Sequence, residues 1–229
     1  MAKECHAGPS LSRRLQSSPI RLRIVRLHSY VVARDYGFAP NPFFGVCTLA
    51  TCKPRIRSVA QIGDWVVGTG SKKRRREKHL VYVMRITGAM TFEEYWNDPR
   101  VQVKKANLRG SKKQAFGDNI YSRDANGKNW CQANSHHSLA DGSPNQSNIR
   151  ADTMANRMLF SNDFTYWGGS GPQIPARFLN YGSDPISLLV GRNHKNNFPP
   201  AFVEQFVAWI RSRGESGYLG EPLDWCRTP

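Results

Sequence analysis

Short apolar runs separated by glycine and proline dominate residues 28–71 and limit what this part of the chain can form. The run at residues 30–33 enters a loop, residues 37–42, whose backbone is stiffened by prolines. Another apolar run begins at Trp65, directly after Gly63 and Asp64. Apolar runs bounded by turn residues are typical of β-strands. This stretch therefore predicts short strands joined by rigid turns.

The strand pattern continues along the first half of the chain, and the best helix lies near the C-terminus. Strand candidates cover residues 27–33, 44–49, 65–70 and 79–86, and the last two flank a basic connection that predicts a hairpin with an exposed tip. Thr91 and Glu94 fit a capping box, which predicts a short helix ending before Asp98. Pro200–Arg211 carries its apolar side chains on one broad helical face, with Gly214 as a stop.

The remaining segments complete an α+β prediction. Residues 100–150 are polar around isolated aromatics, as in a long functional loop or insertion, and residues 159–164 form another strand candidate. We expect a mixed or barrel-like, PUA-like β-sheet with a C-terminal amphipathic helix and a long polar insertion. A single domain at residues 27–229 suits this length. Residues 1–26 are expected to form a flexible basic arm, with a transit-like segment or an upstream start-codon extension as alternatives.

The net charge indicates the class of binding partner, and the cysteine content indicates the cellular compartment. The chain has 33 Lys and Arg against 17 Asp and Glu, a net charge of +16, which concentrates polyanions around it. Nucleic acid or a nucleotide is the expected partner, and a charge that serves only solubility is the alternative. Five cysteines at irregular spacing favour a reducing cytoplasm. No run approaches about 18 apolar residues, so no membrane association is expected. The oligomeric state is not indicated.

Four motifs occur in an order that is similar to a known family. They are Asp35–Phe43, Cys47–Arg57, Gly63–Trp65 and Gly117–Tyr121. Over about residues 26–175 the chain resembles the second family of nucleotide-modification-associated domains. The resemblance implies a bacterial or phage setting, DNA modification or defence, and no particular reaction. The Gly-Asp-aromatic arrangement at residues 63–68 is also similar to PUA, ASCH and EVE β-barrels, which hold a flipped or modified base.

Aromatic and polar side chains around the proline-rich loop and in the polar insertion suit recognition of a base. A base is held by stacking on rings and by hydrogen bonds to its polar edge. The candidate base- or nucleotide-binding residues are Tyr36, Phe38, Asn41, Phe43, Trp65, Asp118, Asn119 and Trp130. The alternative for Phe43 and Trp65 is a place in the core, which aromatic side chains commonly fill.

Two basic clusters are candidates for phosphate binding, because arginine and lysine form charge-assisted hydrogen bonds with phosphate. They comprise Lys53, Arg55, Arg57, Lys72, Lys73, Arg74, Arg75 and Arg76. The alternative is a solvated charged face. The sequence contains no phosphate-cradling Gly-Lys-Ser/Thr loop, dinucleotide fingerprint or carboxylate-rich metal motif, so no cofactor or metal is expected.

The candidate catalytic residues are Asp35, Cys47, His137 and Tyr121. Asp35 follows an apolar strand, where it could act as a general base or brace the loop. Cys47 could act as a nucleophile with His28 or His137 as its base, or remain an inert buried thiol. Cys47 and Cys52 are five residues apart, which fits a zinc site poorly.

Three functions are compatible with these residues. The favoured hypothesis is a module that binds a modified base, nucleotide or nucleic acid. The alternative is a hydrolase or transferase of modified-nucleotide metabolism with Asp35 as general base. A nucleic-acid-binding defence or scaffolding protein with a vestigial pocket is the third.

Overall fold

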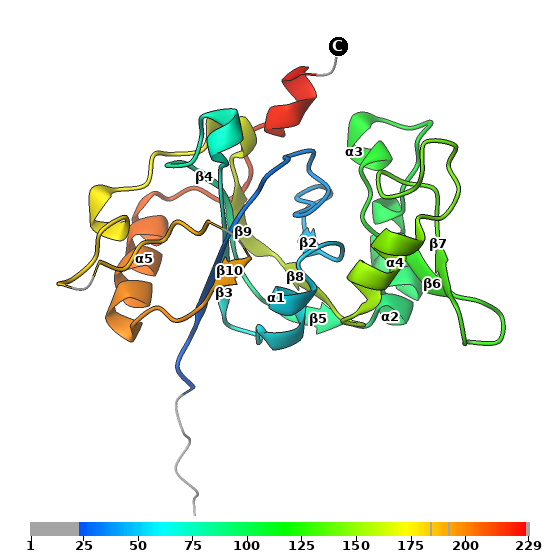
Figure 1. Cartoon of the computed structure of the whole chain (residues 1–229), viewed down its shortest axis with the longest axis horizontal. Helices are drawn as coiled ribbons and strands as arrows, with labels where there is room; N and C mark the ends of the chain where they lie inside the picture. Colours follow the sequence, from blue (N-terminus) through cyan, green and yellow to red (C-terminus); the bar gives the residue numbers. More distant parts are fainter. Residues whose placement is uncertain (1–22, 184, 192, 228–229) are drawn as a thin grey trace, which may run out of the picture.

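The computed structural model describes residues 23–183, 185–191 and 193–227. A six-stranded mixed sheet crosses the centre of the molecule (Figure 1). The C-terminal helix α5 lies on one side of this sheet, and residues 92–157 form a body on the other side (Figure 1). The predicted arm falls mostly at residues 1–22, which lie outside the described residues, whereas Arg23 is tied to the fold by its guanidinium, 2.7 Å from Asp64.

The large sheet is open at both ends. Its strands, in spatial order, are β10 (His194–Lys195), β1 (Leu27–Val31), β3 (Trp65–Thr69), β4 (Leu80–Arg85), β9 (Asp163–Tyr166) and β11 (Gly217–Tyr218). β1 and β3 are parallel, as are β9 and β11, and the other neighbours are antiparallel. The expected mixed α+β fold is confirmed, but the barrel is not. The two edge strands are only two residues long and lie at opposite ends of the sheet, so the described sheet does not close.

Within the described residues, two smaller sheets and five α-helices complete the fold. One sheet has the order β2 (Cys47–Leu49), β8 (Met158–Ser161) and β5 (Gly88–Met90), and a ribbon pairs β6 (Tyr121–Arg123) with β7 (Trp130–Gln132). The helices are α1 (Pro54–Val59), α2 (Phe92–Asn97), α3 (Lys112–Ala115), α4 (Gln146–Thr153) and α5 (Pro200–Ser212). Short 3₁₀ turns are η1 (Lys72–Arg74), η2 (Pro99–Lys104), η3 (Gly168–Ser170), η4 (Ala176–Phe178) and η5 (Leu223–Arg227). No helix in the described part is long and apolar enough to span a membrane.

Side-chain alternation along β3 gives the large sheet two apolar faces. Val66 packs in a core cluster with Leu49 of β2 and Leu159 of β8. Its neighbour Val67 points to the other face and packs in the cluster that contains the apolar side of α5. Both faces are therefore covered, and β1 contributes Leu27 to one cluster and Tyr30 to the other.

Several local predictions are confirmed. β3 and β4 form the expected antiparallel hairpin. Thr91 and Glu94 make both hydrogen bonds of a capping box at the start of α2, which ends at Asn97. In α5 the buried residues include Phe202, Phe206 and Ile210, as the helical pattern predicts.

The polar insertion is more ordered than its composition predicts. Residues 100–150 contain η2, α3, the β6–β7 ribbon and the start of α4, and their isolated aromatics share a third core cluster with Phe92 and Ile149. The strand expected at residues 159–164 is two strands, β8 and β9, which turn at Asn162 because they belong to different sheets.

Candidate functional site

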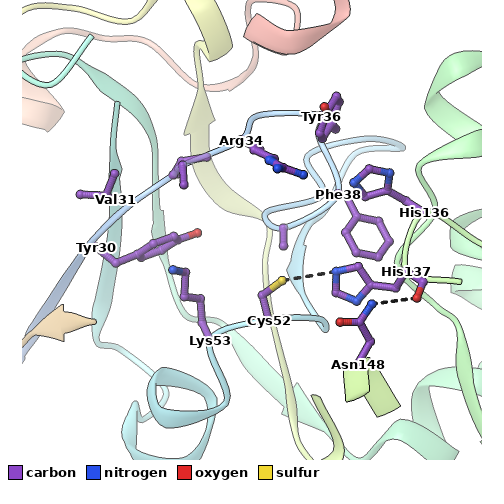
Figure 2. Close-up of a pocket in the computed structure, with 13 residues that line it drawn as sticks. Tyr30, Val31, Arg34, Tyr36, Phe38, Cys52, Lys53, His136, His137 and Asn148 are labelled. Carbon is purple, nitrogen blue, oxygen red and sulfur yellow. Dashed lines mark hydrogen bonds between the residues drawn. The ribbon is translucent and has the colours of Figure 1, made fainter. Parts of the chain in front are cut away.

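A cavity of about 450 Å³ lies where the end of β1, the turn before α1 and the loop at residues 136–137 meet (Figure 2). Its size is that of a small-molecule site. It is lined by Tyr30, Val31, Val32, Ala33, Arg34, Tyr36, Phe38, Ala39, Cys52, Lys53, His136, His137 and Asn148. The cavity thus joins the stiffened loop of the first half to the polar insertion of the second.

The sulfur of Cys52 reaches this cavity from a tight turn between β2 and α1. Cys52 has φ 54° and Lys53 has φ 44°, so two consecutive non-glycine residues adopt the left-handed conformation. Pro54 begins α1 directly after them. The buried Arg57 side chain donates from Nε to the Cys52 carbonyl at 2.9 Å. Such strain is held at functional sites when the surroundings over-determine it.

Cys52, His137 and Asp152 form a linear relay, here called the Cys52 relay. Sγ of Cys52 lies 3.6 Å from Nε2 of His137, and Nδ1 of the same ring lies 2.9 Å from Oδ2 of Asp152. The Cys–His contact is visible in Figure 2. A thiol, an imidazole and a carboxylate in this order constitute the arrangement of nucleophile, base and orienting group.

The carboxylate of the relay is fixed by several donors. Asp152 is buried near the end of α4, and it accepts from the Tyr121 hydroxyl at 2.7 Å and from the Cys52 N–H at 2.6 Å. The Asn148 side chain donates to the His137 carbonyl at 2.8 Å, one turn earlier in α4. These bonds set the ring plane of His137 and its distance from the sulfur.

The two adjacent histidines have opposite electrostatic environments. Burial opposes protonation of His137, but hydrogen bonds to Asp152 and Cys52 outweigh it and raise its pKa to about 9. Burial, together with the charges of His137 and Arg34, lowers the pKa of His136 to about 4. The raised pKa favours the protonated His137 ring at neutral pH, which places a positive charge 3.6 Å from the sulfur of Cys52.

The same three side chains also offer atoms to a metal, since one ligand atom from each lies within 4.8 Å of the others. However, the sulfur and the carboxylate contact opposite nitrogens of the His137 ring. They do not converge on one point as three ligands of a tetrahedral ion would. The geometry favours acid–base chemistry at Nε2 of His137, with Asp152 orienting the ring through Nδ1.

Aromatic rings and two cations form the rest of the cavity wall. The Tyr36 ring lies 4.7 Å from the His136 ring, and the Phe38 ring lies 4.6 Å from that of His137, centroid to centroid. The Lys53 ammonium lies 4.6 Å from the centroid of Tyr30, and burial lowers the pKa of Lys53. Neither Lys53 nor Arg34 forms an ion pair within the described ranges. The cavity wall therefore combines aromatic rings with unpaired positive charge.

Asp35 is not placed as a general base. Its carboxylate accepts from the Tyr166 hydroxyl at 2.5 Å and from the Leu223 N–H at 3.0 Å, and it does not line the cavity. Burial raises the pKa of Asp35 to about 6, against the opposing effect of these hydrogen bonds. Asp35 instead ties the C-terminal segment to the loop after β1, which is the bracing alternative considered above.

Cys47 is likewise not placed as a nucleophile. Its side chain is fully buried in the core beneath β1, and burial raises the pKa of its thiol to about 12. The thiol at the cavity is Cys52, five residues later. The sequence signal for it was its position before Lys53 and Pro54, at a strand-to-helix turn.

Only part of the predicted base-binding set reaches the cavity. Tyr36 and Phe38 line it, as do the predicted His137 and Lys53, whereas Tyr121 acts behind it through Asp152.

Phe43 and Trp65 are core residues, packed against Trp225 and within the α5 cluster, respectively. Trp130 packs on Phe92, and the Arg123 guanidinium lies 3.5 Å from its ring centroid.

Three predicted polar residues belong to buried structural hydrogen bonds. The Lys104 ammonium donates to Asn41 Oδ1 at 2.7 Å and to Thr48 Oγ1 at 3.0 Å. Asp118 accepts from Thr48 at 2.7 Å and from the Tyr95 hydroxyl at 2.8 Å. These five residues are here called the Lys104 network. Beside it, the Asn119 side chain donates to the Tyr95 carbonyl at 2.8 Å.

The predicted phosphate ligands also separate into exposed and structural groups. Arg55 is exposed beside Lys53, but Arg57 is buried, and its donors are used by backbone carbonyls of residues 52, 152, 155 and 157. Arg57 is therefore a structural cation that holds the Cys52 turn against the end of α4.

At the hairpin tip, Arg74 pairs with Asp224 and Arg76 donates to the Gly171 carbonyl at 2.9 Å. Among the predicted phosphate ligands there, Lys72, Lys73 and Arg75 are exposed.

A family model matches residues 24–229, almost all of the described chain. The chain belongs to the family named nucleotide modification associated domain 2. This confirms the family resemblance and extends it to the C-terminal helix, whereas no barrel supports the similarity to PUA-like domains. No curated protein and no solved structure matches the chain. Membership connects the chain with nucleotide modification but does not distinguish binding from catalysis.

Proposed function

We propose that this protein is a thiol-dependent enzyme that acts on a nucleotide or on a modified base, with Cys52 as nucleophile. The observation that carries the proposal is the Cys52 relay, with its sulfur on the wall of a 450 Å³ cavity. The family supports the nucleotide part of the proposal. The partly exposed Tyr36 ring supplies a stacking surface for the base, and the buried Phe38 packs against both histidine rings.

In the first step, the Cys52 thiolate attacks an sp² carbon of the substrate that carries a nitrogen or oxygen leaving group. A carbon–sulfur bond forms, and the bond to the leaving group breaks. The His137 imidazolium gives its proton to the leaving group, which departs as a neutral amine or alcohol. The Lys53 ammonium, on the same wall, stabilises negative charge that develops on the substrate.

In the second step, water attacks the carbon bound to sulfur. The neutral His137 takes a proton from that water, the carbon–sulfur bond breaks, and the thiolate–imidazolium pair is restored. The net reaction is hydrolysis, in which one water replaces one leaving group. Asp152 keeps Nδ1 of the ring protonated throughout and fixes its orientation.

A pocket that only binds a base does not need this relay. Stacking rings and unpaired cations would be enough for recognition. Two left-handed residues, a buried carboxylate with three donors and a histidine held between it and a sulfur point instead to covalent chemistry.

The test is incubation with a panel of modified mononucleotides and oligonucleotides, followed by mass spectrometry of both small molecules and protein. We expect a product or a covalent adduct at Cys52. Cys52→Ser should abolish it, and Cys131→Ser, at an exposed cysteine outside the cavity, should leave it unchanged. Retention of an unchanged ligand by both variants would contradict the proposal and support a binding module.

A further inference from the structure

A second hollow adjoins the reaction cavity. It has a volume of about 400 Å³, and Lys53 lines both hollows. Its other walls come from the start of α1, the residue after α4 and the β10 edge strand, namely Pro54, Arg55, Ile56, Met154, Asn193 and His194. The proposed chemistry at Cys52 uses none of these residues except Lys53.

The electrostatics of this second hollow favour an anion. Arg55 is exposed and has no carboxylate partner among the described residues. Burial and the nearby charges of His28, Arg55 and Lys53 together lower the pKa of His194. The hollow therefore holds a positive field with no acidic side chain in its lining.

The second hollow also offers an apolar surface. Met154 is 77% exposed, the largest exposed fraction among the large hydrophobic residues described. Asn193 places a polar side chain nearby. An apolar side chain can lie against a base, and cations beside it can meet a phosphate, so these groups suit a nucleotide.

We infer that the substrate is a nucleic acid strand, with the target nucleotide in the reaction cavity, a neighbouring nucleotide in the second hollow and the connecting phosphate at Lys53. Consecutive nucleotides share one phosphate, and Lys53 is the cation that the two hollows share. The base must be unpaired or flipped to enter the cavity. For the role of the reaction cavity, this inference rests on the function proposed above.

The experiment measures binding of fluorescein-labelled ten-nucleotide single strands, one of DNA and one of RNA, by anisotropy over a series of salt concentrations. Arg55→Gln should weaken binding about tenfold, the effect of losing a hydrogen bond to a charged group. It should also reduce the slope of log K against log salt by about 0.7, corresponding to one phosphate on a single strand. The strand that binds with the higher affinity shows whether the protein prefers deoxyribose or ribose.

The matched control is Arg109→Gln, which removes the same charge from an exposed arginine outside both hollows. It should leave affinity and slope nearly unchanged. Equal losses in the two variants, or a mononucleotide that competes as well as an unlabelled strand, would overturn the inference.

Iodoacetamide labelling of Cys52 separates this inference from the proposed function. If Cys52 is reactive but the protein binds a strand no better than a mononucleotide, the inference is overturned and the proposed function stands. Strand binding that depends on Arg55, with an inert Cys52, overturns the enzyme and leaves strand recognition in place.

Discussion

The Lys104 network and the Cys52 relay are both buried sets of polar contacts, but only the relay has an end that lies at a cavity. Lys104 and Asp118 are buried, and their polar atoms meet other protein atoms at both ends. The Cys52 relay is anchored in the same way at Asp152, but its other end is a sulfur at a cavity. Buried ionisable groups therefore mark a functional site here only where the chain of contacts opens onto space for a ligand.

The largest contrast is expected between the two thiols. Cys52→Ala should reduce turnover by at least about 10³-fold because the nucleophile is lost, with unfolding free energy changed by less than about 1 kcal/mol. Cys47→Ala should retain activity and lose about 1–2 kcal/mol of stability, because it leaves a small void in the core. Steady-state kinetics and urea unfolding measure both effects, and the reverse pattern would reject the assignment.

The Lys104 network should contribute to stability without contributing to reactivity. Lys104→Met should lower the free energy of unfolding by about 3 kcal/mol, because burial already raises the pKa of Asp118 and the variant would leave this carboxyl buried without its compensating cation. The rate of Cys52 alkylation should stay within about twofold of the wild type. A large fall in that rate, in protein shown to be folded by circular dichroism, would break the distinction between the two systems.

The pH dependence of stability should report the Cys52 relay. The pKa of His137 is raised from 6.5 to about 9, so the stabilisation from its protonated form is complete below pH 6.5 and is lost as pH rises through 9. Between pH 6.5 and 8 the free energy of unfolding should fall by roughly 2 kcal/mol. Urea unfolding at a series of pH values tests this, and His137→Gln should flatten the profile in that window.

The smallest effect is expected at Tyr121. Tyr121→Phe removes one of the donors to Asp152 and should cost about 1 kcal/mol of stability, while turnover falls less than about tenfold. Tyr121 would then be a positioning residue. A loss of turnover as large as that of Cys52→Ala would instead give its hydroxyl a direct part in the chemistry.

Local features of the fold could be predicted because local chemistry decides them. The basic connection between two apolar runs predicted the β3–β4 hairpin. The Thr91 capping box predicted the start of α2, and the apolar face of residues 200–211 predicted α5. Closure of the sheet depends on which distant segments form its edges, and β10 and β11 come from the C-terminal third. The expectation of a barrel failed for that reason.

The candidate site was predicted only in part. Of the predicted site residues, Tyr36, Phe38, Lys53 and His137 line the cavity. Which of Cys47 and Cys52 lines the cavity depends on the left-handed turn at Cys52 and Lys53. The alternation of side chains along a strand does not predict that turn. Asp152 lies in a helix 100 residues from Cys52 in sequence, so only tertiary structure brings them together.

The most direct test is the rate at which iodoacetamide alkylates each cysteine at pH 6.5, followed by peptide mass spectrometry. Cys52 should react at least about tenfold faster than the more exposed Cys131, because the protonated His137 ring places a positive charge beside its sulfur. Asp152→Asn should remove that advantage. A wild-type Cys52 that reacts no faster than Cys131 would contradict the central claim.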